Sequence, residues 1–205
     1  MVASGVLSPG PEDAHGASAH PPIAVQWEHR AFADLTPSEL YNILQLRQDV
    51  FVVEQQCAYA DADGLDHMAT HLFAVHRAIV VAYARIFRPG ARGNVAVIGR
   101  VVTARVARGR GLGREVMRQA IGAIGQAYGP VPIRLGAQTH LQPFYESFGF
   151  VRDGEDYVED GISHLPMRRP GAHQGAAGRA FGDAVSGSPW QTDRASPCVR
   201  EGWRW

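Results

Sequence analysis

The chain has 205 residues, of which 45% are hydrophobic and 20% are charged, and this is the composition of a globular protein large enough for one domain with flanking segments. Its 20 basic and 20 acidic residues balance, and every basic residue is an arginine, because the sequence contains no lysine. Proteins that bind nucleic acid usually carry a basic excess, so the charge balance argues against a nucleic-acid partner.

The two ends of the chain differ from its middle. Residues 1–22 and 170–205 are rich in Pro, Gly, Ser and Ala and show no hydrophobic periodicity, so we expect two flexible segments around one domain at residues 23–169. The N-terminus has neither the basic start nor the apolar run of a secretory signal. The longest apolar run, residues 78–84, is too short to span a membrane.

Within the expected domain, strand-like and helix-like patterns alternate. The first helix is marked by Thr36, Pro37 and Glu39, which form a capping box with proline at the first helical position. Apolar residues continue at helical spacing to Phe51. The predicted strands are residues 24–30, 70–76, 80–87, 95–103, 133–137, 150–157 and 164–168, and the later helices are 112–128 and a short one at 143–148 that ends at Gly149.

This order predicts an α/β (α+β) domain with a mixed sheet of six to seven strands and helices on both faces. Short turns between the early strands indicate antiparallel pairs. The helix between residues 103 and 133 implies a right-handed crossover and one parallel pair.

A glycine-rich turn joins the fourth predicted strand to the long helix. Gly109, Gly111 and Gly113 alternate with Arg108, Arg110, Leu112 and Arg114. Unpaired amide N–H groups and the dipole at a helix start favour an anion, and arginines add charge, so the turn suits a phosphate or pyrophosphate. A P-loop is excluded because it needs lysine, and the even glycine spacing among hairpins does not fit a dinucleotide-binding fingerprint. A plain strand–helix turn with solvated arginines remains the alternative.

The sequence resembles the GNAT acetyltransferase superfamily. Arg108, Gly111 and Gly113 match its R/Q-x-x-G-x-G/A coenzyme A signature, and the stretches LRQDVFVVEQQCAYADADGLD, IGRVVTARVARGRGLG and HLQPFYESFGFVRDGEDYVEDGISHLPMRR resemble its ElaA-type branch. The resemblance covers roughly residues 25–169. It departs from the family at Arg105, where relatives commonly have proline.

The resemblance implies an N-acetyltransferase that uses acetyl-CoA as co-substrate and transfers the acetyl group directly to a primary amine. It also implies a binding site for the coenzyme, in which turn amides hold the pyrophosphate and the preceding strand pairs with the pantetheine arm. The implied binding residues are Val101, Val102, Thr103, Arg108, Gly109, Arg110, Gly111, Leu112, Gly113 and Arg114. A coenzyme A-binding regulatory or interaction module without catalysis is the alternative.

Acyl transfer requires an amine without its extra proton and a proton for the departing thiolate. Tyr145 matches the family's general-acid tyrosine, although a core aromatic is its alternative role. The base is left open between His71 and Glu54, each of which could equally be structural. His164 could line the acceptor site but is also typical of a turn. Cys57 is expected to be an inert thiol.

Two acidic groups could attract a cationic amine: Asp61, Asp63 and Asp66, and Glu155, Asp156, Glu159 and Asp160. Solvated loops are the alternative for both. The expected acceptor is a small-molecule or peptide amine, with no membrane partner, and exposed strand edges leave room for a homodimer.

Cys57 and Cys198 are too few for a disulfide framework or a zinc site. Asp66, His67 and His71 lack a fourth ligand and a zinc-like spacing. We therefore expect a cytoplasmic protein without a bound metal.

Overall fold

The computed structural model describes residues 23–171, which contain the expected domain. The segments predicted to be flexible, 1–22 and 170–205 beyond Gly171, lie outside the described residues. The strands are β1 (Gln26–Ala31), β2 (Thr70–His76), β3 (Ile79–Phe87), β4 (Ala96–Thr103), β5 (Ile133–Gln138), β6 (Val151–Arg152), β7 (Tyr157–Glu159) and β8 (Ile162–Arg169). The α-helices are α1 (Pro37–Arg47), α2 (Leu112–Tyr128) and α3 (Gln142–Glu146).

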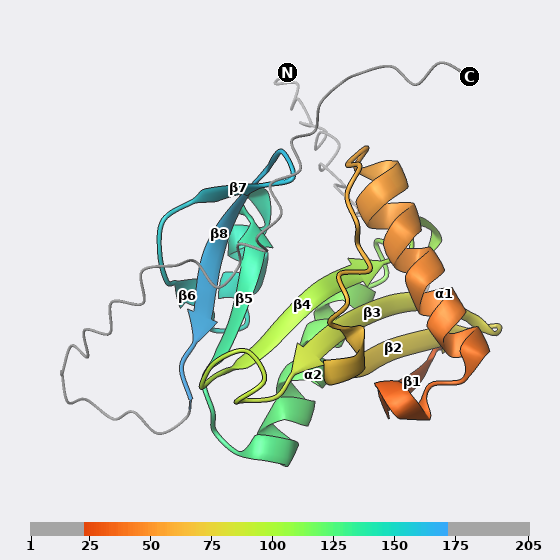
Figure 1. Cartoon of the computed structure of the whole chain (residues 1–205), viewed down its shortest axis with the longest axis horizontal. Helices are drawn as coiled ribbons and strands as arrows, with labels where there is room; N and C mark the ends of the chain where they lie inside the picture. The colour runs from red at the N-terminus through yellow and green to blue at the C-terminus, as the bar shows by residue number, and fades with distance from the viewer. Residues whose placement is uncertain (1–22, 172–205) are drawn as a thin grey trace, which may run out of the picture.

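All these strands form one mixed sheet, as predicted (Figure 1). The order is β1-β2-β3-β4-β5-β8-β6, with β7 also paired to β8. The β4–β5 pair is parallel and its neighbours are antiparallel. The predicted single parallel pair, joined through α2, is therefore confirmed.

The sheet has eight strands rather than six or seven, because residues 150–157 do not form one strand. Val151 pairs with Arg168 in β6, whereas Tyr157 pairs with His164 in β7. The chain leaves the ladder between them opposite Pro166, whose carbonyl oxygen accepts from the Asp153 N–H at 2.9 Å. Proline has no N–H to continue the ladder on this side, so the strand breaks in two.

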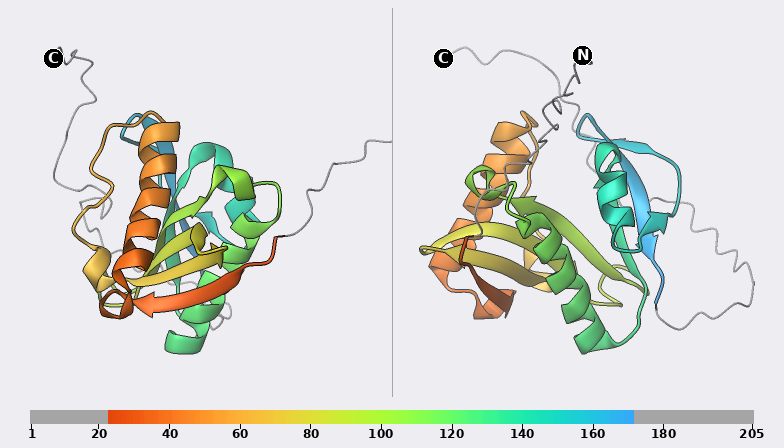
Figure 2. Two further views of the ribbon diagram at one scale, coloured as in Figure 1. Left: turned by 90° about the vertical axis from the view of Figure 1, so that its right-hand side faces the viewer. Right: turned by 180° about the vertical axis from the view of Figure 1, so that it is seen from behind.

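Helices cover both faces of the sheet (Figure 2). On one face, Ile43 and Leu46 of α1 pack with Phe73, Tyr83 and Val102. On the other face lies the larger core, to which α3 also contributes. The side chains that α2 buries there include Val116, Met117, Ala120 and Ile124. Successive side chains of a strand point to opposite faces of the sheet, so the same strands contribute side chains to both cores.

The first helix begins as the sequence predicts and ends differently. Thr36 Oγ1 accepts from the Glu39 N–H, and the Glu39 carboxylate accepts from the Thr36 N–H at 2.8 Å, so the capping box is complete. Beyond Arg47 the chain continues as a wider π-helical segment, η2 (Gln48–Glu54), instead of an α-helix to Phe51. Such segments are rare in proteins, and where they do occur they often lie at functional sites.

A largely buried cluster of six charges attaches the loop before β2 to the sheet. Arg47 binds Asp61 and Asp66, each at 2.7 Å, and Arg85 binds Asp63 at 2.6 Å and Asp66 at 2.9 Å. Arg100 completes the cluster by binding Asp61 at 2.7 Å. The three carboxylates are thus neutralised by three guanidinium groups, and they do not form the free negative wall that the sequence suggested.

We expect Arg47→Met to lower the free energy of unfolding by roughly 3–5 kcal/mol, because it leaves buried carboxylates short of a partner. The matched control is Arg134→Met, which removes a 2.8 Å pair with Asp153 from a side chain that is 40% exposed. The control should cost about 1 kcal/mol or less. Urea unfolding measures both, and equal costs would contradict a structural role for the cluster.

Acid should weaken the fold through Asp63. Burial alone would raise the pKa of Asp63, but its hydrogen bonds and ion pair with Arg85, the Leu65 N–H and the charge of Arg100 lower the pKa to about 2. A lowered carboxyl pKa adds stability above the unfolded value, and that stability is lost as pH falls through the folded value.

We therefore expect the unfolding free energy to drop between about pH 3.8 and about pH 2. The drop should be shallower in Asp63→Asn, which cannot ionise. Urea midpoints across this range provide the measurement, and an unchanged slope in the variant would assign the acid sensitivity to other groups.

Candidate active site

The site opens where the two central strands stop pairing. Only Ala96 and Val97 of β4 pair with β5, opposite Ile133 and Arg134. Beyond them the two strands diverge and leave a wedge in the middle of the sheet (Figure 1). Backbone groups on the inner edges of the wedge have no neighbouring strand to bind, so the wedge can accept an extended ligand that carries amide groups.

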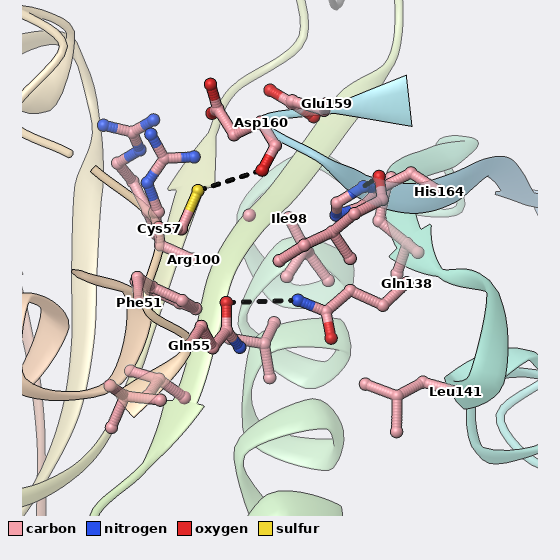
Figure 3. Close-up of a pocket in the computed structure, with 18 of the residues that line it drawn as sticks. Phe51, Gln55, Cys57, Ile98, Arg100, Gln138, Leu141, Glu159, Asp160 and His164 are labelled. Atoms are coloured by element: carbon pink, nitrogen blue, oxygen red, sulfur yellow. Dashed lines mark hydrogen bonds between the residues drawn. The ribbon is translucent and has the colours of Figure 1, made fainter. Parts of the chain in front are cut away.

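A pocket of about 550 Å³ occupies this wedge (Figure 3). Its walls come from β4 on one side and from β5, β7 and β8 on the other. Gln55, at the end of η2, approaches Gln138 of β5 across the opening, with their side-chain amides 3.4 Å apart. The π-helical segment thus brings the chain after α1 to the rim of the pocket.

A β-bulge shapes the β4 wall. Tyr83 pairs with Val102 and Arg85 with Gly99, so two residues of β4 face one residue of β3. Arg100 in the bulge has φ +52°, a left-handed conformation that is uncommon for residues other than glycine. Its guanidinium group is held by Asp61 and lies 5.7 Å from the centre of the Tyr59 ring, so the ionic cluster stabilises the bulge.

The glycine-rich turn lies between the end of β4 and the start of α2. Gly109 and Gly111 have φ of +72° and +79°, so both occupy the left-handed region, and Gly111 is the N-cap of α2. Gly113 has an ordinary helical conformation, and a Cβ there would meet Phe144 and Thr103 at 4.0 Å, a normal contact. The first N–H groups of α2 have no partner within the helix, as the sequence predicts for an anion site.

Two arginines of the turn already have protein partners. Arg108 makes a two-pronged ion pair with Glu54, at 2.6 and 3.0 Å. Arg114 donates to Ser147 Oγ at 3.1 Å and lies over the rings of Phe144 and Phe148, which ties the start of α2 to α3.

The structure distributes the expected cofactor residues over two places. Val101, Val102, Thr103 and Arg108 line the pocket. Gly109, Arg110, Gly111, Leu112, Gly113 and Arg114 continue from its end into the first turn of α2, outside the pocket walls. An extended ligand could therefore reach from the wedge to the helix start.

Tyr145 of α3 lines the pocket and is only 6% exposed. Its ring packs edge-on against Phe144 and Phe150. Burial raises the pKa of its phenol to about 12, so the group keeps its proton at neutral pH and can act as a donor.

Glu54 also lines the pocket, on η2. The hydrogen bond and charge of Arg108 lower the pKa of its carboxyl group. While this pair is intact, Glu54 is a weak proton acceptor, because the ionised form is already stabilised.

His71 lies elsewhere. It is fully buried on β2, outside the pocket walls, with Nδ1 2.9 Å from the Tyr83 hydroxyl and Nε2 3.0 Å from the Asp66 carbonyl oxygen. Burial lowers the pKa of the ring. With both nitrogens engaged, His71 supports the ionic cluster and is separated from the site that Tyr145 and Glu54 share.

Cys57 is buried in the pocket wall, and its thiol donates to the Asp160 carbonyl oxygen at 3.0 Å. This contact connects the loop after η2 to the turn between β7 and β8. Of the second acidic group, Glu159 and Asp160 line the pocket, whereas Asp156 pairs with Arg152 at 2.6 Å.

Sequence reasoning missed several pocket residues. Arg100, Gln138 and Tyr157 line the pocket and were not singled out. His164, for which the sequence left open an acceptor-site role and a turn role, lines the pocket as well. His164 and Leu165 are neighbours in the last strand, so their side chains point to opposite faces of the sheet. Because a leucine is expected in the core, this alternation could have indicated that His164 faces away from the core. The bulge at Arg100 leaves no comparable pattern in the sequence.

Within residues 23–171, no helix is both long and apolar enough to cross a membrane. In the same part of the chain, no three or more His, Cys, Asp or Glu side chains gather in a way that could hold a metal ion.

Known proteins are similar to this chain in both sequence and fold. The model of the acetyltransferase (GNAT) domain matches residues 37–170. The protein ElaA of Escherichia coli is 41% identical over 147 residues, which cover 71% of this chain and 96% of ElaA.

Solved structures agree. The crystal structure of E. coli ElaA superposes with a TM-score of 0.67 at 40% identity, over 71% of this chain and 99% of that one. An acyl-CoA N-acyltransferase from Pseudomonas aeruginosa gives a TM-score of 0.68 at 44% identity, over 70% of this chain and 99% of that one. The chain therefore belongs to the GNAT acetyltransferase family, in its ElaA-type branch.

Proposed function

We propose that this protein transfers an acetyl group from acetyl-CoA to a primary amine, by direct attack of the amine on the thioester while both substrates are bound. Acyl transfer from coenzyme A is the activity of the family. The observation that carries the proposal is the wedge between β4 and β5, because it leads from a buried proton donor, Tyr145, to the anion-binding start of α2.

Acetyl-CoA fits this path by its chemistry. Its pantetheine arm carries amide groups that the free edge of β4 at Val101–Thr103 can bind as a neighbouring strand would. Its pyrophosphate matches the unpaired N–H groups at the start of α2. The Arg108 side chain can also bind phosphate if it exchanges Glu54 for the ligand.

Tyr145 supplies the proton that the departing coenzyme thiolate needs. The phenol is protonated at neutral pH and faces the pocket, whereas a module that only binds coenzyme A would not need a proton donor there. Tyr145 therefore favours an enzyme over a binding module.

The acceptor is proposed to be a cationic amine. Glu159 and Asp160 line the pocket beside β8, where they can attract an ammonium group. Arg85 and Arg100 also line this region, but the carboxylates of the ionic cluster neutralise them.

Isothermal titration of acetyl-CoA tests the binding half of the proposal. We expect micromolar binding by the parent and loss of binding by Gly111→Asp, because aspartate adopts a φ of +79° less readily than glycine and its carboxylate places a negative charge at the anion site. Gly113→Ala is the matched control and should retain binding, since its Cβ makes only normal contacts. Absence of binding by the parent would overturn the proposed function.

Tyr145→Phe tests the proton donor. We expect the rate of amine-dependent thiol release to fall by about 10²–10⁴-fold, with an unchanged dissociation constant for acetyl-CoA. Because the pKa of Tyr145 is raised to about 12, the parent should show no loss of rate from phenol ionisation at moderately alkaline pH. A variant as active as the parent would assign Tyr145 to packing alone.

A further inference from the structure

A row of three side chains crosses β5, β8 and β7, in the part of the sheet that lines the pocket together with Glu159 and Asp160. His164 of β8 pairs with Gln138 of β5 on one side and with Tyr157 of β7 on the other. Directly opposed residues in antiparallel strands project from the same face, so the three side chains stand together. All three line the pocket, as do Ile162 and Glu159, the next pair on the same face of the ladder.

The ring of His164 is held in one orientation. Its Nδ1 lies 2.9 Å from the Ile162 carbonyl oxygen, and the ring stacks on Tyr157 with centroids 5.7 Å apart and an interplanar angle of 26°. A carbonyl oxygen can only accept a hydrogen bond, so this contact assigns the proton of the neutral ring to Nδ1. Nε2 then carries the lone pair and can accept a proton.

Tyr157, on which the ring of His164 stacks, is positioned by a glycine of β5. An ideal Cβ on Gly136 would clash with Tyr157 Oη, so the phenol occupies space that the glycine leaves open on β5. The same hydroxyl is buried and has no hydrogen-bond partner within residues 23–171. A polar group of a bound substrate could supply that partner, because the ring lines the pocket next to His164.

His164 and Tyr145 approach the pocket from opposite faces of the sheet. Leu165, the next residue after His164, is fully buried in the core that also contains Tyr145. Neighbouring residues of a strand point to opposite faces, so His164 points away from that core. A thioester in the wedge would have the phenol on one side and the imidazole on the other.

We propose that His164 is the catalytic base of this enzyme and that its Nε2 takes a proton from the ammonium form of the acceptor. This inference rests on the proposed acetyl transfer. The freed amine nitrogen attacks the thioester carbon, a C–N bond forms, and the C–S bond breaks. The thiolate takes the Tyr145 proton, the second proton lost by the nitrogen restores the phenol through solvent, and His164 releases its proton to solvent.

Other ionisable groups line the same pocket. Besides Tyr145 and Glu54, they are Cys57, Tyr59, Asp63, Arg85, Arg92, Arg100, Arg108, His140, Tyr157, Glu159 and Asp160. His140 is the useful control, because it lies on the short segment η5 (Thr139–Leu141), lines the same pocket and has no part in the proposed proton transfer.

The test compares His164→Gln with His140→Gln on two acceptors. One is a primary alkylamine from an amine screen, which is an ammonium ion at neutral pH. The other is methoxyamine, which is already unprotonated at neutral pH and needs no base to free its lone pair. Acetyl-CoA titration of each variant establishes that the coenzyme site is intact.

We expect His164→Gln to lower kcat/KM for the alkylamine by about 10²–10⁴-fold, to affect methoxyamine far less, and to leave acetyl-CoA binding unchanged. His140→Gln should behave like the parent. Equal losses on both acceptors, or parental activity on the alkylamine, would overturn the role of His164. A parent that transfers to no amine would instead overturn the proposed function, and with it this inference.

The ring itself provides a readout that does not depend on activity. In ¹⁵N-histidine-labelled protein, the signals missing from His164→Gln identify the ring of His164. The structure predicts a proton on Nδ1 and a lone pair on Nε2 in the neutral form. The opposite tautomer would overturn the proposal without any reference to acetyl transfer.

Discussion

The strands β4 and β5 lie in the middle of the sheet, yet they lose their pairing soon after it begins, and this loss creates the pocket. A central pair of strands that stays together for only two residue pairs leaves unpaired backbone groups in the middle of a sheet. Such groups are costly to bury without a partner. The fold tolerates the gap because β4 is held from its other side by β3 and β5 is held by β8. The gap then remains open for a ligand.

The ionic cluster explains how the β4 wall keeps its shape. Arg100 adopts a backbone conformation that few non-glycine residues favour, and its side chain is fixed by Asp61. Asp61 is fixed in turn by Arg47 of α1. A strained residue of this kind persists only where its surroundings hold it, so the cluster stabilises both the fold and the pocket wall.

The sequence predicted the elements with strong local signals. The capping box at Thr36 and the long helix that begins at Leu112 after the glycine-rich turn depend on neighbours in the chain, and both predictions are confirmed. The break between β6 and β7 depends on Pro166, which meets that segment only after the sheet has formed. Long-range contacts of this kind leave little trace in a local pattern.

The site was predicted unevenly for the same reason. The glycine-rich turn is continuous in sequence, and Tyr145 was found through a family resemblance. The position of His71 depends on partners from β3 and from the loop before β2, and His164 acquires its place from the pairing of β5, β8 and β7. A residue type alone therefore could not distinguish a buried structural histidine from one that faces the pocket.

Hydrogen exchange of backbone amides, with and without acetyl-CoA, tests most directly whether the wedge and the start of α2 form one coenzyme site. We expect acetyl-CoA to slow exchange at residues 101–103 and 108–114 together, and to leave β1 and β2, which do not border the wedge, unchanged. Protection elsewhere, with these two segments unaffected, would contradict this expectation.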